Sequence, residues 1–332
     1  MEAPPPPEPV NETLALGDPD GWVAALGQLA WRRAWRKLVE IAGTMLVAHR
    51  GGGAPGLTAD QAMDLRLRRA MGMLKLGRAA EAAEAAVEAG QEAGQPPLAA
   101  VTVAARVAAA GAKSVCEGEA EEEALDELTA LKVTAAAAGE EGARASVDNV
   151  RVELLSRIGR VFLQFGSLED AEVYFRRAEA AAAVAGSNPR ILVNRGLLDF
   201  SRNEFVAAQE NFRNAATEAA MLAAKEEPPD GSDDNWLWAT LDQGAGLLDA
   251  ALNNLSLAMV YSCDVLRGVR TLEGLIRKDP RLYMLDVVIF NLCTLYDLSF
   301  DAVASAKKKR TLQAVAQRFR LEDIDASSFR MS

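Results

Sequence analysis

Apolar side chains between residues 252 and 296 recur at the period of an α-helix in two successive segments. The first segment has Leu252, Leu255, Met259 and Val260, and the second has Val265, Val269, Leu272, Leu275 and Ile276. Pro280 ends the second segment, because proline has no amide hydrogen and restricts the residue before it. A third segment then starts the pattern again, with Asn291 and Leu292 in the places of Asn254 and Leu255. This repetition predicts stacked helical hairpins.

A second copy of the pattern lies between residues 154 and 178, where small and large side chains take fixed places on two short helices. Gly166 stands at the turn between them, and the small-large-small run of the second helix returns at Ala208, 37 residues after Ala171. Small residues let two helices approach closely, and the arrangement resembles a tetratricopeptide repeat, whose period is about 34 residues. The positions expected to pack the repeats are Leu155, Gly159, Phe162, Ala171, Phe175, Ala178, Gly196, Ala208, Phe212, Ala215, Asn254, Leu255, Gly268, Leu272, Pro280, Asn291, Leu292 and Tyr296.

Regular alternation of β-branched and polar residues is almost absent from the chain. The sequence therefore predicts an all-α fold, a tetratricopeptide-repeat-like superhelix (α-solenoid) of helical hairpins. We expect residues 20–320 to form this solenoid. Residues 1–19 contain a proline run and are expected to be a disordered lead-in, and residues 321–332 are expected to be a flexible tail.

Composition and charge narrow the classes of partner. Of the 332 residues 50% are hydrophobic but only 6% are aromatic, and alanine is abundant, which fits closely packed helices. The net charge of −11 argues against non-specific nucleic-acid binding and against an anionic membrane surface. No apolar run reaches about 18 residues, so we expect no direct membrane insertion. The 3 cysteines are too few for a disulfide framework or a zinc site and fit a reducing cytoplasm. We therefore expect other proteins as partners.

Candidate catalytic chemistry is not found in the sequence. The single histidine, His49, stands beside a glycine-rich loop, where we expect a polar residue at a helix end rather than a base. The phosphate-loop pattern is absent, and the stretch from Gly244 to Gly246 is too short for a dinucleotide-binding motif. We expect no catalytic residue, no cofactor and no metal site, and hence no enzymatic activity.

One basic cluster breaks the acidic character of the chain. It consists of Lys307, Lys308, Lys309 and Arg310, followed by the apolar Leu312 and Val315. An ordinary helix surface is one interpretation. The other is a docking site, in which the cations orient an acidic partner and the apolar residues anchor it. The repeat pattern is also lost near this cluster. Ser305 stands where the pattern expects a small residue, and Lys309 stands where it expects a large apolar one. This loss agrees with a docking role for the end of the array.

The C-terminal segment contains a helical pattern F-N-L-x-T-x-Y-[DE]-L, then a polar link, a lysine-containing stretch and an L-x-A-V-A pattern. The residues of these patterns are Phe290, Asn291, Leu292, Thr294, Tyr296, Asp297, Leu298, Lys308, Lys309, Leu312, Ala314, Val315 and Ala316. In this order the patterns resemble the end of the subunit twelve family of the trafficking protein particle (TRAPP) complex. The segments LLSRIGRVFLQFGSLEDAEVYF, AWRKLVEIAGTMLVAH and LKLGRAAEA extend the resemblance to most of residues 30–316.

This resemblance implies a non-catalytic scaffold subunit of a vesicle-tethering complex, which acts on Rab-family GTPases in endoplasmic reticulum-to-Golgi traffic and in autophagy. The implied partners are the other TRAPP subunits and, indirectly, Rab GTPases. The implied location is cytoplasmic, peripheral to the ER–Golgi intermediate region or the Golgi. The alanine-rich and acidic residues 98–149 depart from the family, and the long N-terminal half of animal members has no counterpart in this sequence.

A generic repeat adaptor is the alternative class of function. A co-chaperone of this kind binds the carboxylate at the end of a partner's peptide with lysines and asparagines on the inner helices. The corresponding positions of the clearest repeat carry Ser156 and Arg160 instead. This difference favours the scaffold interpretation.

Overall fold

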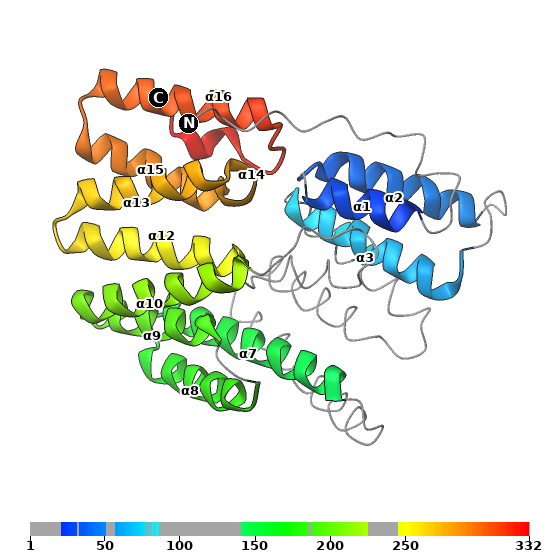
Figure 1. Cartoon of the computed structure of the whole chain (residues 1–332), viewed down its shortest axis with the longest axis horizontal. Coiled ribbons are helices and arrows are strands. Elements are labelled where there is room, and N and C mark those ends of the chain that lie inside the picture. Colours follow the sequence, from blue (N-terminus) through cyan, green and yellow to red (C-terminus); the bar gives the residue numbers. More distant parts are fainter. Residues whose placement is uncertain are drawn as a thin grey trace. The chain divides into compact units, whose positions relative to one another are not determined.

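The computed structural model describes residues 21–31, 33–50, 57–76, 78, 81–82, 84–85, 141–185, 188–224 and 245–331, and every regular element within these ranges is a helix (Figure 1). The lead-in predicted for residues 1–19 lies outside the described residues. The chain folds into two compact units. One holds residues 36–202, and the other joins the segment up to residue 35 with residues 203–332.

The unit of residues 36–202 contains a helical hairpin with its own apolar core. Its described helices are α2 (Trp35–Arg50), α3 (Ala59–Lys75), α7 (Glu141–Gln164), α8 (Leu168–Ala185) and α9 (Pro189–Ser201). α7 packs against α8, and α9 packs against both. The buried core of this group includes Ala171, Phe175 and Leu198, with Phe162 and Leu163 packed against it. The small and large positions of the repeat thus meet between helices, as close packing of an amphipathic pair requires.

The turn between α7 and α8 depends on one residue in the left-handed backbone conformation. Gly166 has φ +79°, a value that glycine adopts without steric strain. The N–H of Gly166 donates to the carbonyl of Leu163 at 3.0 Å, and the N–H of Ser167 donates to the carbonyl of Phe162 at 2.9 Å. These two bonds form a Schellman motif, which satisfies carbonyls that the end of α7 would otherwise leave without partners.

The second unit contains α1 and the C-terminal array of helices. Its elements are α1 (Gly21–Trp31), α10 (Phe205–Ala223), α12 (Ala245–Tyr261), α13 (Val265–Lys278), α14 (Pro280–Tyr283), α15 (Asp286–Ser299), α16 (Ala302–Phe319) and the 3₁₀ helix η1 (Ala326–Phe329). α10 packs on α12, α12 on α13, α13 on α15, and α15 on α16. The α12–α13 turn and the α15–α16 turn lie at the same edge of this unit (Figure 1).

Aspartates fix where the helices of the C-terminal array begin. Asp264 accepts from the N–H of Arg267 at the start of α13, and Asp301 accepts from the N–H groups of Val303 and Ala304 at the start of α16. These bonds satisfy amide groups that have no partner within the helix. α13 then turns one apolar face inward, with buried Gly268, Val269, Leu272, Leu275 and Ile276.

Residues 321–331 pack against the last hairpin, which is formed by α15 (Asp286–Ser299) and α16 (Ala302–Phe319). This packing corrects the expectation of a flexible C-terminal tail. η1 contacts α15 and α16, and its Phe329 is buried. The Oγ of Ser328 donates to the carboxylate of Asp286 at 2.6 Å, and the N–H of Asp325 donates to the same carboxylate at 2.8 Å. An array of repeats needs a cap on its last member, because that member has no neighbour. The short polar tail supplies part of this cap through one buried aromatic ring.

Candidate partner-binding site

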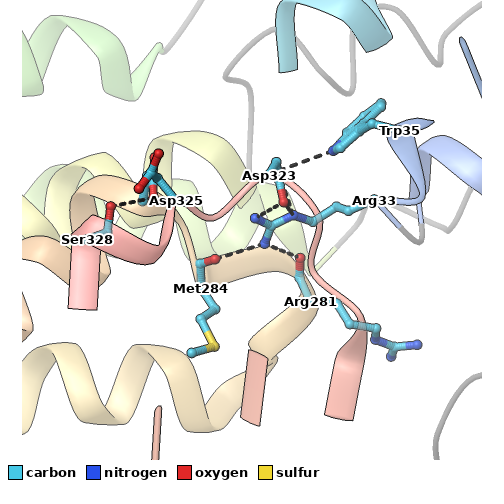
Figure 2. A network of polar contacts seen from close by, with 8 residues as sticks. Arg33, Trp35, Arg281, Met284, Asp323, Asp325 and Ser328 are labelled. Atoms are coloured by element: carbon cyan, nitrogen blue, oxygen red, sulfur yellow. Dashed lines mark hydrogen bonds and ion pairs between the residues drawn. The ribbon is translucent and has the colours of Figure 1, made fainter. Parts of the chain in front are cut away.

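Arg33 joins the N-terminal segment to the C-terminal tail within one unit (Figure 2). Its Nε lies 2.9 Å from both carboxylate oxygens of Asp323. Its Nη1 donates to the carbonyls of Arg281 and Met284, each at 3.0 Å. The indole N–H of Trp35 donates to the same Asp323 carboxylate at 3.2 Å. One guanidinium therefore holds three segments of the chain together.

The Arg33–Asp323 pair is almost completely buried. The side chains are 7% and 9% exposed, and the backbone of Arg33 is left-handed with φ 57°. A buried ion pair stabilises a fold only when further hydrogen bonds satisfy both groups, and the two carbonyls and the indole supply them here. No pattern in the sequence predicts this pair, because the two residues lie 290 positions apart and share no periodicity.

Lys309 carries a charge but occupies a buried core position of α16. Its side chain is 6% exposed. Its Nζ donates to the Asp297 carboxylate at 2.7 Å and to the carbonyl of Arg330 at 3.0 Å. Ser305, the other polar residue at a core position, donates to Asp297 at 2.6 Å. Burial alone would raise the pKa of Asp297, but the hydrogen bonds from Lys309 and Ser305 outweigh it and hold the pKa below its usual value.

Lys308 points toward α13 and two aromatic rings. Its Nζ lies 2.8 Å from the Glu273 carboxylate and 4.9 Å from the ring centroids of Tyr296 and Phe300. The hydroxyl of Tyr296 donates to the same carboxylate at 3.0 Å. Burial would raise the pKa of Glu273, but the bonds from Lys308 and Tyr296 lower it further than burial raises it. Burial, with the neighbouring Glu273 carboxylate, raises the pKa of Tyr296 far above its usual value.

These contacts divide the predicted basic cluster into residues with partners inside the chain and residues that face solvent. Lys308 and Lys309 serve intramolecular ion pairs, and Leu312 is buried. The helical period explains this division, since consecutive residues of a helix point in different directions. Lys307 and Arg310 are exposed and Val315 is half-buried. A docking role stays a prediction for these last three residues.

Polar side chains link successive first helices of the hairpins at the repeat period. The Nδ2 of Asn194 in α9 donates to the Oγ of Ser156 in α7 at 2.7 Å, 38 residues away. In the other unit the Nδ2 of Asn291 in α15 donates to the Oδ1 of Asn253 in α12 at 2.9 Å, also 38 residues away. Asn254, the residue singled out from the sequence, is half-buried beside this pair. Buried polar pairs of this kind fix the register between neighbouring helices.

Ser156 and Arg160 stand where a co-chaperone would carry its carboxylate-binding residues, and both have partners within the chain. Ser156 donates to the carbonyl of Val152 at 2.6 Å in addition to its bond with Asn194. Arg160 donates to Glu153 at 3.0 Å, and Glu153 also receives a bond from the Nε of Arg190 at 2.7 Å.

The remaining residues expected to pack the repeats lie between helices. The buried members are Leu155, Gly159, Ala171, Phe175, Ala178, Gly196, Ala208, Phe212, Ala215, Leu255, Gly268, Leu272, Pro280, Leu292 and Tyr296. Phe162 is half-buried and stacks on Tyr174 with 5.3 Å between ring centroids. Two helices also approach closely at Gly268, where an added Cβ would lie 3.0 Å from Oγ of Ser256.

Candidate metal ligands do not gather in the described part of the chain, where no group of three histidine, cysteine or acidic residues could hold an ion. His49 is half-buried. Cys293 is buried, and this burial raises the pKa of its thiol to about 11, whereas Cys263 is exposed in the α12–α13 turn. Among the described helices none is long and apolar enough to cross a membrane.

The fold defines the class of protein: an α-solenoid of tetratricopeptide-like helical hairpins. Within this class the chain is similar in sequence to trafficking protein particle complex subunit 12. The mouse protein of that name is 30% identical over 169 residues, which are 50% of this chain and 18% of that protein. The human protein is 29% identical over 167 residues, 49% of this chain and 19% of that protein. No protein-family model matches the chain.

The match spans less than one fifth of the length of these curated relatives, 18% and 19%.

Two solved structures resemble the chain at low sequence identity. The Cut9–Hcn1 hetero-tetramer of APC/C has a TM-score of 0.49 at 13% identity, over 90% of this chain and 46% of that chain. Acl4, an assembly chaperone of RpL4, has a TM-score of 0.48 at 13% identity, over 89% of this chain and 99% of that chain.

Proposed function

We propose that this chain is a non-catalytic scaffold subunit of the TRAPP vesicle-tethering complex. Through protein–protein contacts it acts in transport between the endoplasmic reticulum and the Golgi and in autophagy. Its partners are the other subunits of the complex and, through them, Rab-family GTPases. It works in the cytoplasm, peripherally associated with the ER–Golgi intermediate region or the Golgi.

The observation that carries this proposal is the sequence similarity of half the chain to subunit 12 from mouse and human. The architecture agrees with a scaffold, because each hairpin buries its apolar face on its neighbours and leaves the edges and ends of the array to other proteins. The polar residues of the last hairpin agree as well. Lys308 and Lys309 have structural ion pairs, which explain their presence without any catalytic role.

Affinity purification of the tagged chain from cells, followed by mass spectrometry, tests the proposal. We expect the other TRAPP subunits to be recovered in amounts comparable with the tagged chain, and to be absent from a tag-only control. Recovery of heat-shock proteins without TRAPP subunits would instead support the adaptor function. That result would contradict the scaffold proposal.

We also propose that Lys307 and Arg310 contribute to docking at the end of the array. Exposed charges at the rim of an interface act mainly on the rate of encounter and on its salt dependence. The variant Lys307→Glu/Arg310→Glu should therefore weaken co-purification most at low salt, while its helix content stays that of the parent. Lys308 and Lys309 stay unchanged in this variant, so that their internal ion pairs persist. Equal recovery at every salt concentration would place the docking surface elsewhere.

A further inference from the structure

One side of α15 presents apolar side chains to solvent. Val287 is 54% exposed, Phe290 is 45% exposed and Leu298 is 64% exposed. Together with the half-buried Thr294 they stand three or four residues apart, so the helix places all four on the same side. We name these four residues the α15 stripe. The opposite side of α15 is buried and consists of Val288, Ile289, Leu292, Cys293, Leu295 and Tyr296.

The C-terminal tail places one guanidinium on the α15 stripe. The Cζ of Arg330 lies 5.1 Å from the centroid of the Phe290 ring, and its Nη1 donates to the Oγ1 of Thr294 at 2.8 Å. Asp297 stands one turn further along the same side of the helix, with its side chain 43% exposed. An aromatic face, a hydroxyl oxygen and a carboxylate are groups that bind a guanidinium. These three residues therefore form a site for an arginine side chain.

The tail does not need the Arg330 guanidinium for its attachment. Phe329 is buried, Ser328 donates to Asp286, and the Nζ of Lys309 donates to the backbone carbonyl of Arg330. The Arg330 side chain itself is exposed, and an exposed contact between a cation and a ring is weak. It also covers only the middle of the α15 stripe. Another arginine can therefore displace this guanidinium while the tail stays in place.

The charge on α12 and α15 favours a cationic ligand at this site. These two neighbouring helices contain aspartates but no lysine or arginine. Asp286, directly before the α15 stripe, accepts hydrogen bonds from the tail. Within the described residues it belongs to no ion pair, although Arg318 and Arg320 are exposed at the end of α16. A ligand that carries positive charge next to apolar side chains complements this surface.

The other cations of the array do not cover the α15 stripe. Lys308 and Lys309 of α16 have internal partners in Glu273 and Asp297. α13 and α16 pack on α15 from its buried side, where the hydroxyl of Tyr296 donates to Glu273. The exposed cations of these two helices are Arg267, Arg270, Arg277, Lys278, Lys307, Arg310 and Arg318. Arginine is thus the cation whose binding the exposed side of α15 already displays.

We propose that Phe290, Thr294 and Asp297 form an arginine-binding site for a segment of a partner protein, and that Arg330 occupies it as an internal competitor. The partner's arginine replaces the Arg330 guanidinium, and apolar residues on either side of it cover Val287 and Leu298. Between those two residues the stripe is about 16 Å long, which an extended segment of about five residues spans. The identity of the partner as another TRAPP subunit rests on the proposed function.

Two pairs of matched variants test the site. Phe290→Leu keeps an apolar side chain but removes the ring face, and Thr294→Val keeps the shape but removes the hydroxyl acceptor. Each should lower recovery of the other TRAPP subunits about tenfold. The controls Phe290→Trp and Thr294→Ser keep the ring face and the hydroxyl, so they should retain recovery. All four variants should unfold at the denaturant midpoint of the parent. Equal recovery within either pair, or a loss that follows a lowered midpoint, would overturn the site.

Arg330→Ala tests the internal competition. The variant keeps the backbone carbonyl that accepts from Lys309, so the tail stays attached. The apparent affinity for the partner should rise, because a larger fraction of the chains has an open site. Titration of the purified chain against a fixed amount of cell extract measures the concentration that captures half of the TRAPP subunits. We expect this concentration to fall severalfold. An unchanged or higher concentration would overturn the proposal.

The outcomes separate this inference from the proposed function. If the parent chain recovers the TRAPP subunits and Phe290→Leu recovers them equally well, the arginine site is overturned and the function stands. If the parent chain recovers no TRAPP subunit, the function is overturned, and the site is then judged by cross-linking alone.

Cross-linking identifies the occupant in the folded full-length chain. A photoreactive benzoylphenylalanine replaces Val287 in one protein and Val173 of α8 in the other, each expressed in cells and irradiated. Both valines are 54% exposed. The helical neighbours of Val173 are charged, namely Glu169, Asp170, Arg176 and Arg177. We expect position 287 to capture a peptide of another protein in which an arginine is flanked by apolar residues. A peptide without arginine, a peptide of a second copy of this chain, or equal yields at the two positions would overturn the proposal.

Discussion

A methyl group added to Gly159 would lie within 2.5 Å of Cδ1 of the Phe175 ring. This distance is shorter than any ordinary contact between carbon atoms, so the two helices meet there at the closest approach that a glycine permits. Gly159 lies within α7, where glycine is less favourable than alanine by about 0.5–1 kcal/mol. The packing of the Phe175 ring against the backbone offsets that loss.

The substitution Gly159→Ala should therefore destabilise the chain despite the better helix propensity of alanine. We expect a loss of about 1–3 kcal/mol in the free energy of unfolding, because Phe175 must move within a packed core. Urea denaturation followed by circular dichroism measures it. The control is Gly274→Ala on α13, where an added Cβ meets nothing within 4 Å. This control should stabilise the chain by up to about 1 kcal/mol. The same midpoint shift in both variants would contradict the close approach.

The two sides of the Lys309–Asp297 pair should respond unequally to substitution. Asp297→Ala leaves a buried ammonium with the carbonyl of Arg330 as its remaining partner, and we expect a loss of about 1–3 kcal/mol. Lys309→Met keeps most of the volume and leaves only a half-exposed carboxylate behind, so the loss should stay below about 1.5 kcal/mol. Equal losses in denaturant unfolding would mean that Lys309 is not buried as described.

Acid should weaken the α13–α16 contact through Glu273. Its folded-state pKa lies below the usual value, so its contribution to stability is present above the unfolded pKa of about 4.3 and is lost as pH falls through the folded pKa. Glu273→Gln removes this titration. The stability difference between the parent and the variant should thus be largest near neutral pH and should shrink below about pH 4. Unfolding curves collected from pH 7 to pH 3 test this, and a difference independent of pH would contradict it.

Loss of Asp323 should release the C-terminal tail. Asp323→Ala leaves the buried guanidinium of Arg33 without its counter-ion, which costs about 3–5 kcal/mol for a fully buried pair. Hydrogen exchange should show faster exchange in residues 321–331, together with a lower unfolding midpoint. The double variant Arg33→Met/Asp323→Leu should recover part of the lost stability, because apolar side chains need no counter-ion. Unchanged exchange in the tail of Asp323→Ala would show that buried Phe329 and the hydrogen bonds of the tail to Asp286 and Lys309 hold it without this ion pair.

The helical hairpins could be predicted from the sequence because their cause is local. Apolar residues at the helical period give each helix one buried face, and Pro280 marks a boundary that any fold must respect. The alternation of small and large residues at Gly159, Ala171 and Phe175 predicted which helices would meet closely. These signals involve residues within a few tens of positions of one another, so they can be recognised in the sequence without knowledge of the tertiary structure.

Only the tertiary structure determined which charged residues are buried in ion pairs and which face solvent. Lys307 to Arg310 form one cluster in sequence, but the direction of each side chain on α16 sends Lys308 to Glu273 and Lys309 to Asp297. The ordering of the tail has the same origin, since Arg33 meets Asp323 across 290 residues. A buried charge is stable only where other segments bring it a counter-ion and hydrogen bonds, and the periodicity of one helix holds no information about those segments.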